Sequence, residues 1–166
     1  DGYKDLIVAN RNKQQNFIYL NNGKEEFSTK IPFGSGSDET RSVGVADIDK
    51  DGFLDVITAN INEPNMIYFG DSEMSYQRKI MFDSSSSNSY SLDFGDINNN
   101  GNIDIVIGNS GEPNTVFLNY KKGTSWKKII LNKKDFYTYD IILADLNNDQ
   151  KLDIIESNSD AINYYY

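Results

Sequence analysis

The stretch Asp47-Ile48-Asp49-Lys50-Asp51-Gly52-Phe53-Leu54-Asp55 places acidic side chains at positions 1, 3, 5 and 9 of a nine-residue motif, with glycine at position 6. Two further copies follow, Asp96-Ile97-Asn98-Asn99-Asn100-Gly101-Asn102-Ile103-Asp104 and Asp145-Leu146-Asn147-Asn148-Asp149-Gln150-Lys151-Leu152-Asp153. The chain opens with Asp1-Gly2-Tyr3-Lys4-Asp5, which corresponds to positions 5 to 9. Repetition at matching spacing indicates a repeat protein.

The spacing of oxygen atoms in the motif predicts a calcium site. Calcium takes six to eight oxygens at about 2.3–2.6 Å and tolerates irregular geometry, whereas magnesium requires a near-ideal octahedron. Positions 1, 3, 5 and 9 would ligate through side chains and position 7 through its backbone carbonyl, while glycine at position 6 accommodates positive φ. The absence of nitrogen and sulfur ligands disfavours zinc and copper.

We therefore expect about three Ca²⁺ sites, plus one incomplete site at the start of the chain. The candidate ligands are Asp47, Asp49, Asp51, Phe53 and Asp55; Asp96, Asn98, Asn100, Asn102 and Asp104; Asp145, Asn147, Asp149, Lys151 and Asp153; and Asp1, Tyr3 and Asp5.

Two other interpretations of the motif were weighed. An Asp- and Asn-rich turn without metal is common in proteins, but four carboxylates packed closely without a cation would repel one another. An EF-hand needs glutamate at position 12 and flanking helices. Position 12 is Thr58 in one copy, Ile107 in the next and Glu156 in the last, where the neighbouring residues are typical of a strand.

The acidic side chains give the loops different charges: −4 for Asp47–Asp55, −3 for Asp145–Asp153 and −2 for Asp96–Asp104. Because ligand charge tunes calcium affinity, we predict that the 47–55 loop binds most tightly. Gln150 replaces the glycine of position 6, so we expect backbone strain there of about 1 kcal/mol.

Composition narrows the function classes. The 166 residues carry a formal net charge of −9, which disfavours binding to nucleic acid or to an anionic membrane. The sequence contains neither cysteine nor histidine, so thiol chemistry and the commonest general base are absent. No apolar run approaches the roughly 20 residues of a membrane span.

The position-9 residues Asp5, Asp55, Asp104 and Asp153 are 50, 49 and 49 residues apart. Short apolar runs around each motif predict four strands per repeat, with the cation loop between the first and second. A four-stranded sheet buries both faces only by stacking on neighbours, so we expect an all-β propeller, with a linear array of β modules as the alternative. The expected units of this single propeller segment are residues 1–40 (partial), 41–88, 89–137 and 138–166 (partial).

Several residues have an expected structural place. Small residues in the first strands suit crowding near an axis (Gly44, Ala46, Gly95 and Ala144). Glu63-Pro64-Asn65 predicts a hairpin turn in which proline fixes φ and asparagine tolerates unusual φ.

The segments 34–40 and 84–91 are rich in glycine, serine and aspartate and predict loops. Lysines in the fourth strands suit outer edges, and Trp126 is expected to be a packing residue.

Asp-x-Asp-x-Asp-Gly-x-x-Asp before a strand, repeated about every 49 residues, resembles the FG-GAP/VCBS repeat of integrin-α-type β-propellers. The 47–55 copy matches fully, the 96–104 copy has asparagine at positions 3 and 5, and the 145–153 copy departs at Gln150. The resemblance implies blades around an axis, calcium in these loops, usually seven or eight blades, and an extracellular or cell-surface setting. The strand count, about three and a half blades, predicts continuation into further blades rather than ring closure by a dimer.

The expected function is a non-enzymatic, calcium-stabilised interaction domain for adhesion or for binding a protein or glycan, with structural metals. One alternative is the propeller domain of a secreted polysaccharide-acting enzyme such as a lyase, although no catalytic constellation appears in this sequence. Another is a purely structural module of a large extracellular assembly.

Overall fold

The computed structural model describes residues 2–24 and 26–166, and this part of the chain is all-β. Its strands form four antiparallel sheets, which we call blades 1 to 4. Blade 1 contains β1 (Leu6–Val8), β2 (Gln14–Leu20) and β3 (Thr29–Asp38); blade 2 contains β4 (Thr40–Ala46), β5 (Asp55–Asn60), β6 (Asn65–Tyr68) and β7 (Lys79–Asp83); blade 3 contains β8 (Ser89–Gly95), β9 (Asp104–Asn109), β10 (Thr115–Asn119) and β11 (Trp126–Ile130); blade 4 contains β12 (Tyr137–Ala144), β13 (Asp153–Ser159) and β14 (Tyr164–Tyr165).

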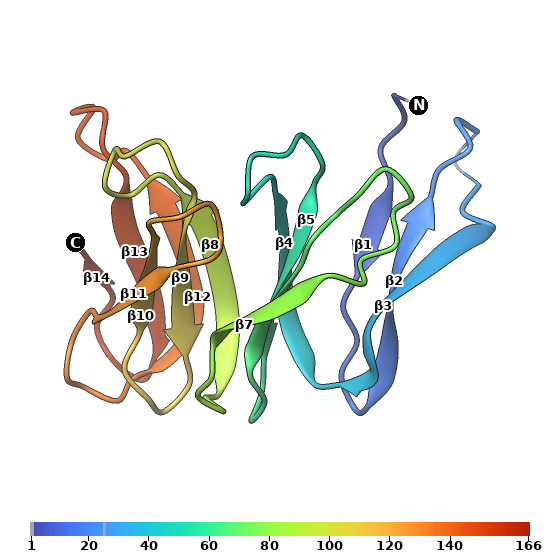
Figure 1. Cartoon of the computed structure of the whole chain (residues 1–166). Coiled ribbons are helices and arrows are strands. Elements are labelled where there is room, and N and C mark those ends of the chain that lie inside the picture. The colour runs from blue at the N-terminus through green and yellow to red at the C-terminus, as the bar shows by residue number, and fades with distance from the viewer. Residues whose placement is uncertain (1, 25) are drawn as a thin grey trace.

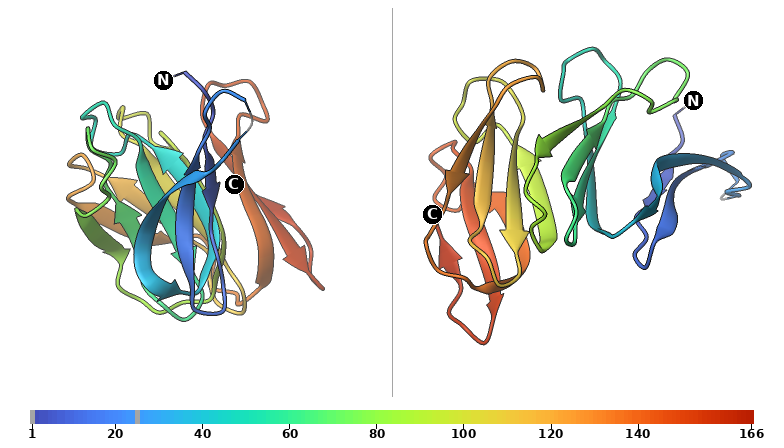
Figure 2. Two further views of the ribbon diagram at one scale, coloured as in Figure 1. Left: turned by 90° about the vertical axis from the view of Figure 1, so that its right-hand side faces the viewer. Right: turned by 60° about the horizontal axis from the view of Figure 1, so that its bottom comes forward.

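The blades follow one another side by side in an arc, with the N-terminal and C-terminal blades at its two ends (Figures 1 and 2). Strand β4 lies against β8, and β8 lies against β12. The first strands therefore form the inner edge of the arc, and β7 and β11 are outer-edge strands of their sheets. This is the expected propeller-blade architecture, with strand numbers of three, four, four and three among the described residues.

The nine-residue motifs connect the first and second strands of blades 2, 3 and 4, as predicted. The β4–β5 pairing runs from Ala46↔Asp55 to Thr40↔Asn60, with a bulge between Thr40 and Ser42. The β8–β9 pairing has the same register and the same bulge position. All the motif loops lie at one edge of the sheets, the upper edge in Figure 1.

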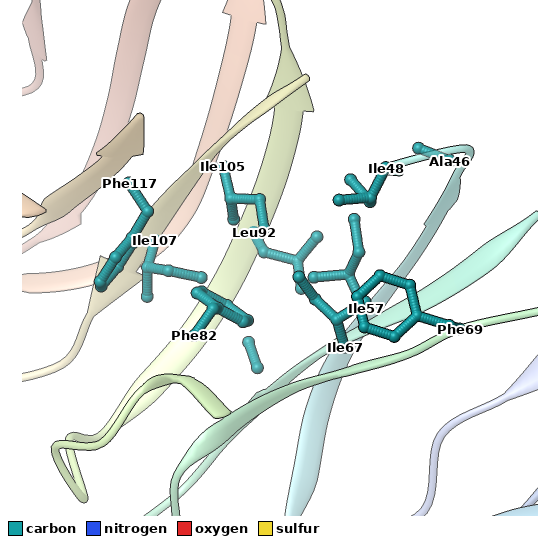
Figure 3. Packing of buried hydrophobic residues seen from close by; sticks show 11 residues of the cluster. Ala46, Ile48, Ile57, Ile67, Phe69, Phe82, Leu92, Ile105, Ile107 and Phe117 are labelled. Atoms are coloured by element: carbon teal, nitrogen blue, oxygen red, sulfur yellow. The ribbon is translucent and has the colours of Figure 1, made fainter. Parts of the chain in front are cut away.

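The core consists of three clusters, one at each junction between neighbouring blades. Because side chains alternate across a strand, Val56 of β5 packs toward blade 1 and Ile57 packs toward blade 3, each with no exposed surface. The largest cluster joins blades 2 and 3 and includes Phe82 and Phe117 (Figure 3). Burying each such side chain contributes roughly 1.5–3 kcal/mol, so stacking of blades supplies the apolar burial that a single sheet lacks.

Small residues on the inner strands make close approach of the blades possible. A Cβ on Gly44 would lie 2.5 Å from Cε1 of Phe94 in blade 3. A Cβ on Gly95 would lie 2.5 Å from Cδ1 of Leu152 in blade 4. The expectation of crowding near the axis is therefore confirmed at Gly44 and Gly95. Trp126 is also a packing residue, partly buried against the blade 2–blade 3 cluster, with its Nε1 donating to the carbonyl of Gly123 at 3.0 Å.

Asparagines close each second-to-third-strand hairpin by one repeated pattern. In blade 2, the Asn60 backbone N–H donates to Oδ1 of Asn65 at 2.8 Å, and Asn60 Nδ2 donates to the Pro64 carbonyl at 2.7 Å. The interpretation that Asn65 takes up unusual φ was wrong: the positive φ of this turn, 56°, belongs to Asn62. Asn65 is instead a fully buried acceptor and donor, which gives it a hydrogen-bonding role.

The same asparagines connect each blade to the next. Nδ2 of Asn65 donates to Oγ of Ser89 at 2.9 Å, and Ser89 donates onward to Oδ1 of Asn109 at 3.0 Å. Nδ2 of Asn114 makes the equivalent bond to Oγ1 of Thr138 at 2.9 Å. A polar chain thus crosses the blade junctions at the edge opposite the motif loops, and it satisfies groups that burial would otherwise leave unpaired.

Both connectors are shorter than predicted, and in the second one residues 89–91 already belong to β8. Residues 34–40 were expected to form a loop, but β3 continues to Asp38. Gly34 and Gly36 adopt φ of 95° and 94°, so the strand bulges while keeping its pairing with β2. Asp38, which is buried, holds the bulge by accepting from the backbone N–H of Ser35 at 2.8 Å.

Candidate metal centres

The backbone of each motif loop turns at two positions. Position 6 has positive φ in all copies: 95° at Gly52, 83° at Gly101 and 67° at Gln150. The predicted strain at Gln150 is thus present as a left-handed conformation in a residue with a side chain. Sequence reasoning missed the second turn, at position 4, where Lys50 has φ of 61°. Asn99 and Asn148 share this conformation, and asparagine at that position was the available signal.

The aspartate at position 1 organises the turn. The two carboxylate oxygens of Asp47 accept the backbone N–H groups of Asp51 at 3.1 Å and Gly52 at 3.0 Å. Asp96 and Asp145 make the same pair of bonds in their own loops. Because this geometry recurs in every complete motif, the loops have one common backbone shape.

The aspartate at position 9 ties its loop to the body of the blade. In blade 2, the Asp55 carboxylate accepts from the backbone N–H of Ile48 at 2.8 Å and of Gly70 at 2.9 Å, and Asp55 has no exposed surface. Asp104 is equally buried and makes the equivalent bonds with Ile97 and Asn119. Position 9 therefore has a structural role as a hydrogen-bond acceptor that the sequence did not reveal.

Burial changes the acidity of these carboxyl groups. Desolvation raises the pKa of Asp55 from 3.8 to about 6; its two backbone hydrogen bonds oppose the rise, and the nearby charges of Asp49 and Asp51 add to it. Desolvation by burial also raises the pKa of Asp104. A raised pKa means that the negative charge at position 9 is unfavourable in its environment.

Three acidic side chains converge in blade 2. Asp47, Asp49 and Asp55 each offer an oxygen, and these oxygens all lie within 4.8 Å of one another. Oδ1 of Asp49 is buried and has no hydrogen-bond partner. A buried anionic oxygen without a donor is costly, and a hard divalent cation would satisfy it. This donor set of hard oxygens and the orphaned atom fit calcium.

Arg78, just before β7, is a neighbour of this site that the sequence analysis did not identify. Its guanidinium pairs with Oδ2 of Asp49, lies 3.6 Å from Asp51 and stacks 3.9 Å from the centre of the Phe69 ring. Arg78 pairs with Oδ2 of Asp49, whereas the buried Oδ1 has no hydrogen-bond partner. An outer partner of this kind orients a ligand for a metal. Its distance from the motif in sequence explains why no local signal revealed it.

The other predicted ligands converge less. Asp51 is not among the three clustered carboxylates; its Oδ1 accepts from the backbone N–H of position 7, Phe53, at 2.9 Å. The other two loops have the same bond, because Oδ1 of Asn100 accepts from the backbone N–H of Asn102 and Oδ1 of Asp149 accepts from that of Lys151. At position 3, Oδ1 of Asn98 and Oδ1 of Asn147 each accept a hydrogen bond from the backbone N–H of the position-5 residue of the same loop. In the part of the chain that the structure describes, no acidic trio besides that of blade 2 meets the 4.8 Å distance, so Asp145, Asp149 and Asp153 do not form one.

The first motif copy is only partly described. Asp1 lies outside the described residues. Asp5 and Tyr3 are exposed, and Oδ1 of Asp5 accepts from the backbone N–H of Asn21 at 2.8 Å. Because Asn21 directly follows β2, the equivalent of β6 and β10, the position-9 bond is present in blade 1 as well.

The motif loops of blades 2 and 3 are also joined to each other. Nδ2 of Asn119, whose backbone donates to Asp104, reaches the Ile48 carbonyl of the blade 2 loop at 3.4 Å. Asn119 is fully buried and also accepts from the Gly123 backbone at 2.8 Å. The motif loop of blade 2 is therefore held in place in part by a side chain of blade 3.

The profile of an FG-GAP-like repeat matches the chain three times, over residues 1–58, 47–107 and 96–156. The chain belongs to the FG-GAP-like repeat family. Each match begins within one copy of the motif and extends just beyond the next, so the FG-GAP-like repeats coincide with the arrangement of motif loops and blades described above. A search of curated proteins found no match.

This membership agrees with the propeller-blade architecture and makes the chain a repeat interaction domain. Among residues 2–24 and 26–166, no helix is long and apolar enough to cross a bilayer.

Proposed function

We propose that this FG-GAP-like repeat segment is a calcium-stabilised extracellular interaction domain that binds a protein or glycan, with calcium in a structural role. The observation that carries the metal assignment is the blade 2 site, where Asp47, Asp49 and Asp55 converge around the unpartnered Oδ1 of Asp49. Asp51 and the position-7 carbonyl of Phe53 would complete the oxygen set. The corresponding loops of blades 3 and 4 would hold calcium more weakly, because they carry fewer carboxylates.

The proposed contribution of calcium is electrostatic. Carboxylates held within a few ångströms repel one another, and a divalent ion converts that repulsion into attraction. The pKa of Asp55 is raised chiefly by burial, and the neighbouring charges of Asp49 and Asp51 add to the rise. Calcium would therefore stabilise the loop and, through the Asp55 bond to Gly70 at the end of the third strand, the sheet beneath it.

The composition supports an interaction role in an extracellular setting. Extracellular calcium is abundant enough for sites with dissociation constants of about 10⁻⁴–10⁻³ M, the range of extracellular modules. The net charge of −9 and the absence of histidine and cysteine from the sequence favour binding of a protein or glycan over nucleic-acid binding or thiol chemistry. The motif loops gather at one edge of the arc (Figure 1), and calcium would fix their shape there.

The decisive experiment is thermal unfolding of the same protein in calcium, in magnesium and in excess chelator. A ligand that binds only the folded state raises stability by mass action. We expect the melting temperature to rise with calcium concentration and to respond much less to magnesium. Equal melting temperatures in calcium and chelator would refute the metal assignment. A glycan array and a cell-surface protein array, both probed in calcium, would then test the interaction role.

A further inference from the structure

Ile48 occupies position 2 of the blade 2 motif, between two of the converging aspartates, Asp47 and Asp49. It has no exposed surface and belongs to the core cluster between blades 2 and 3. Its backbone N–H donates to Asp55 at 2.8 Å, and its carbonyl accepts from Nδ2 of Asn119 in blade 3 at 3.4 Å. Because a peptide unit is planar, this second bond also restrains the backbone nitrogen of Asp49.

The side chain of Asn119 is itself held in one orientation. It is fully buried, its Oδ1 accepts from the backbone N–H of Gly123 at 2.8 Å, and its Nδ2 also donates to the Ile103 carbonyl at 3.2 Å. Its backbone N–H donates to Asp104 at 2.7 Å. An amide whose oxygen and nitrogen are both engaged cannot turn without breaking these bonds. Asn119 therefore presents a fixed donor to the motif loop of blade 2.

The equivalents of Asn119 in the other blades lack this contact. They are identified by their backbone bond to the position-9 aspartate, and they are Asn21 in blade 1 and Gly70 in blade 2. Nδ2 of Asn21 donates within its own blade, to the Lys4 carbonyl at 3.1 Å. Gly70 has no side chain, and a Cβ there would lie 2.3 Å from the Leu54 carbonyl oxygen. Among the described residues, Asn119 alone of these three donates to the motif loop of another blade.

We propose that Asn119 is a positioning residue of the blade 2 calcium site, so that blade 3 completes this site across the blade junction. The role rests on the proposed calcium function, because Asn119 acts on the ion only through the backbone between Asp47 and Asp49. Ligands that are held in place before the ion arrives lose less freedom when it binds, which raises affinity. Outer partners of metal ligands act in this way.

The same contact transmits an effect in the opposite direction. Coupling between a binding site and another part of a protein is reciprocal. If the bond from Asn119 favours calcium in blade 2, calcium in blade 2 must favour that bond. The ion then also stabilises the loop after β10, because Gly123 donates to Asn119. Calcium in one blade would thereby strengthen the junction with the next.

The first experiment is calcium titration calorimetry of the unchanged chain and three variants. Asp49→Ala removes a ligand and identifies the blade 2 site as the binding event that is lost. Asn119→Gly keeps the backbone bond to Asp104 and copies the glycine that blade 2 has in this place. It should weaken calcium binding at the blade 2 site about tenfold, the lower end of the effect of outer partners. Asn21→Gly makes the matched change in blade 1 and should leave the blade 2 site unchanged.

The outcomes separate the positioning role from the calcium function. Equal affinity of Asn119→Gly and the unchanged chain at the blade 2 site would overturn the role of Asn119 and leave the calcium function standing. Equal weakening by Asn21→Gly would also overturn that role, because it would reveal a general loss of order. Absence of calcium binding to the unchanged chain would overturn the calcium function and the role of Asn119 with it.

A second measurement needs no substitution at Asn119. Amide hydrogen exchange of Gly123 reports on the Asn119 side chain, which accepts from that N–H. Asp49→Ala removes a ligand from blade 2 and leaves the blade 3 motif intact, so it controls for calcium bound in blade 3. Calcium should slow the exchange of Gly123 about tenfold more in the unchanged chain than in Asp49→Ala, because the coupling is reciprocal. Equal slowing in both proteins would overturn the proposal.

Discussion

Removal of the Asp49 carboxylate should stabilise the metal-free protein. The oxygens of Asp47, Asp49 and Asp55 lie within 4.8 Å of one another, and a like-charged pair at that distance repels by about 3.5 kcal/mol at an effective dielectric constant of about 20. Asp49→Ala also removes the ion pair with Arg78, which is more than half exposed and contributes about 0–1 kcal/mol. Relief of one such repulsion, less the ion pair, gives an expected net gain in chelator of about 2.5–3.5 kcal/mol.

The same substitution should reduce the benefit of calcium. At about 10 mM calcium, one site with a dissociation constant of about 10⁻⁴–10⁻³ M raises the free energy of unfolding by about 1.4–2.7 kcal/mol. Because Asp49→Ala removes an inner ligand, the stabilisation that calcium gives the variant should be smaller than that of the unchanged chain by this amount. Urea unfolding in calcium and in chelator measures both quantities.

Asp55→Ala provides the contrasting control. It leaves the buried N–H groups of Ile48 and Gly70 without an acceptor, at about 1–3 kcal/mol each, so it should destabilise the protein in both media. Two results would refute the reasoning on Asp49. If Asp49→Ala loses stability in chelator, the Asp49 carboxylate is not repelled by its neighbours. If calcium stabilises the variant as much as the unchanged chain, Asp49 is not a calcium ligand.

Three further predictions follow from single residues. The pKa of Asp55, raised to about 6, means that in chelator its contribution to stability is fully present below pH 3.8 and is lost as pH rises through 6. Protons compete with calcium there, so the gap between melting temperatures in calcium and chelator should shrink from pH 7.5 to pH 5; a constant gap would contradict this. Gln150→Gly relieves a φ of 67° and should raise stability by about 0.5–1 kcal/mol in chemical denaturation, whereas a loss would show that the turn is unstrained. Asn65→Ala orphans the buried Asn60 N–H and should cost about 1–3 kcal/mol equally in calcium and chelator; a calcium-dependent cost would argue against a purely structural bond.

The strands and the loop turns could be predicted because their causes are local. Short apolar runs bounded by turn residues marked the second strands, and the Asp-x-Asp-x-Asp-Gly pattern marked the turn at Gly52. The spacing of about 49 residues then placed the same elements in each blade. Gln150 was identified as strained from the pattern alone, and its φ bears this out.

Contacts between residues far apart in sequence could not be predicted in this way. Arg78, which precedes β7, reaches Asp49 from 29 residues along the chain, and Asn119 reaches the Ile48 carbonyl from blade 3. Neither residue belongs to the motif, and each depends on how two strands or two blades come together. The acceptor role of Asp55 was hidden for the same reason, since one of its donors, Gly70, follows the third strand.

The sequence by itself determined the repeat, its all-β character and the oxygen-rich loops, because periodicity and turn chemistry depend on neighbours along the chain. Only the tertiary structure decided which oxygens converge and which carboxylates are buried. These properties depend on packing of blades against one another, where burial and distance set the cost of each charge. Blades 2 and 3 are both enclosed by neighbouring blades, which buries Asp55 and Asp104 equally. Of the two, only blade 2 also has an aspartate at position 3, so its carboxylates converge there.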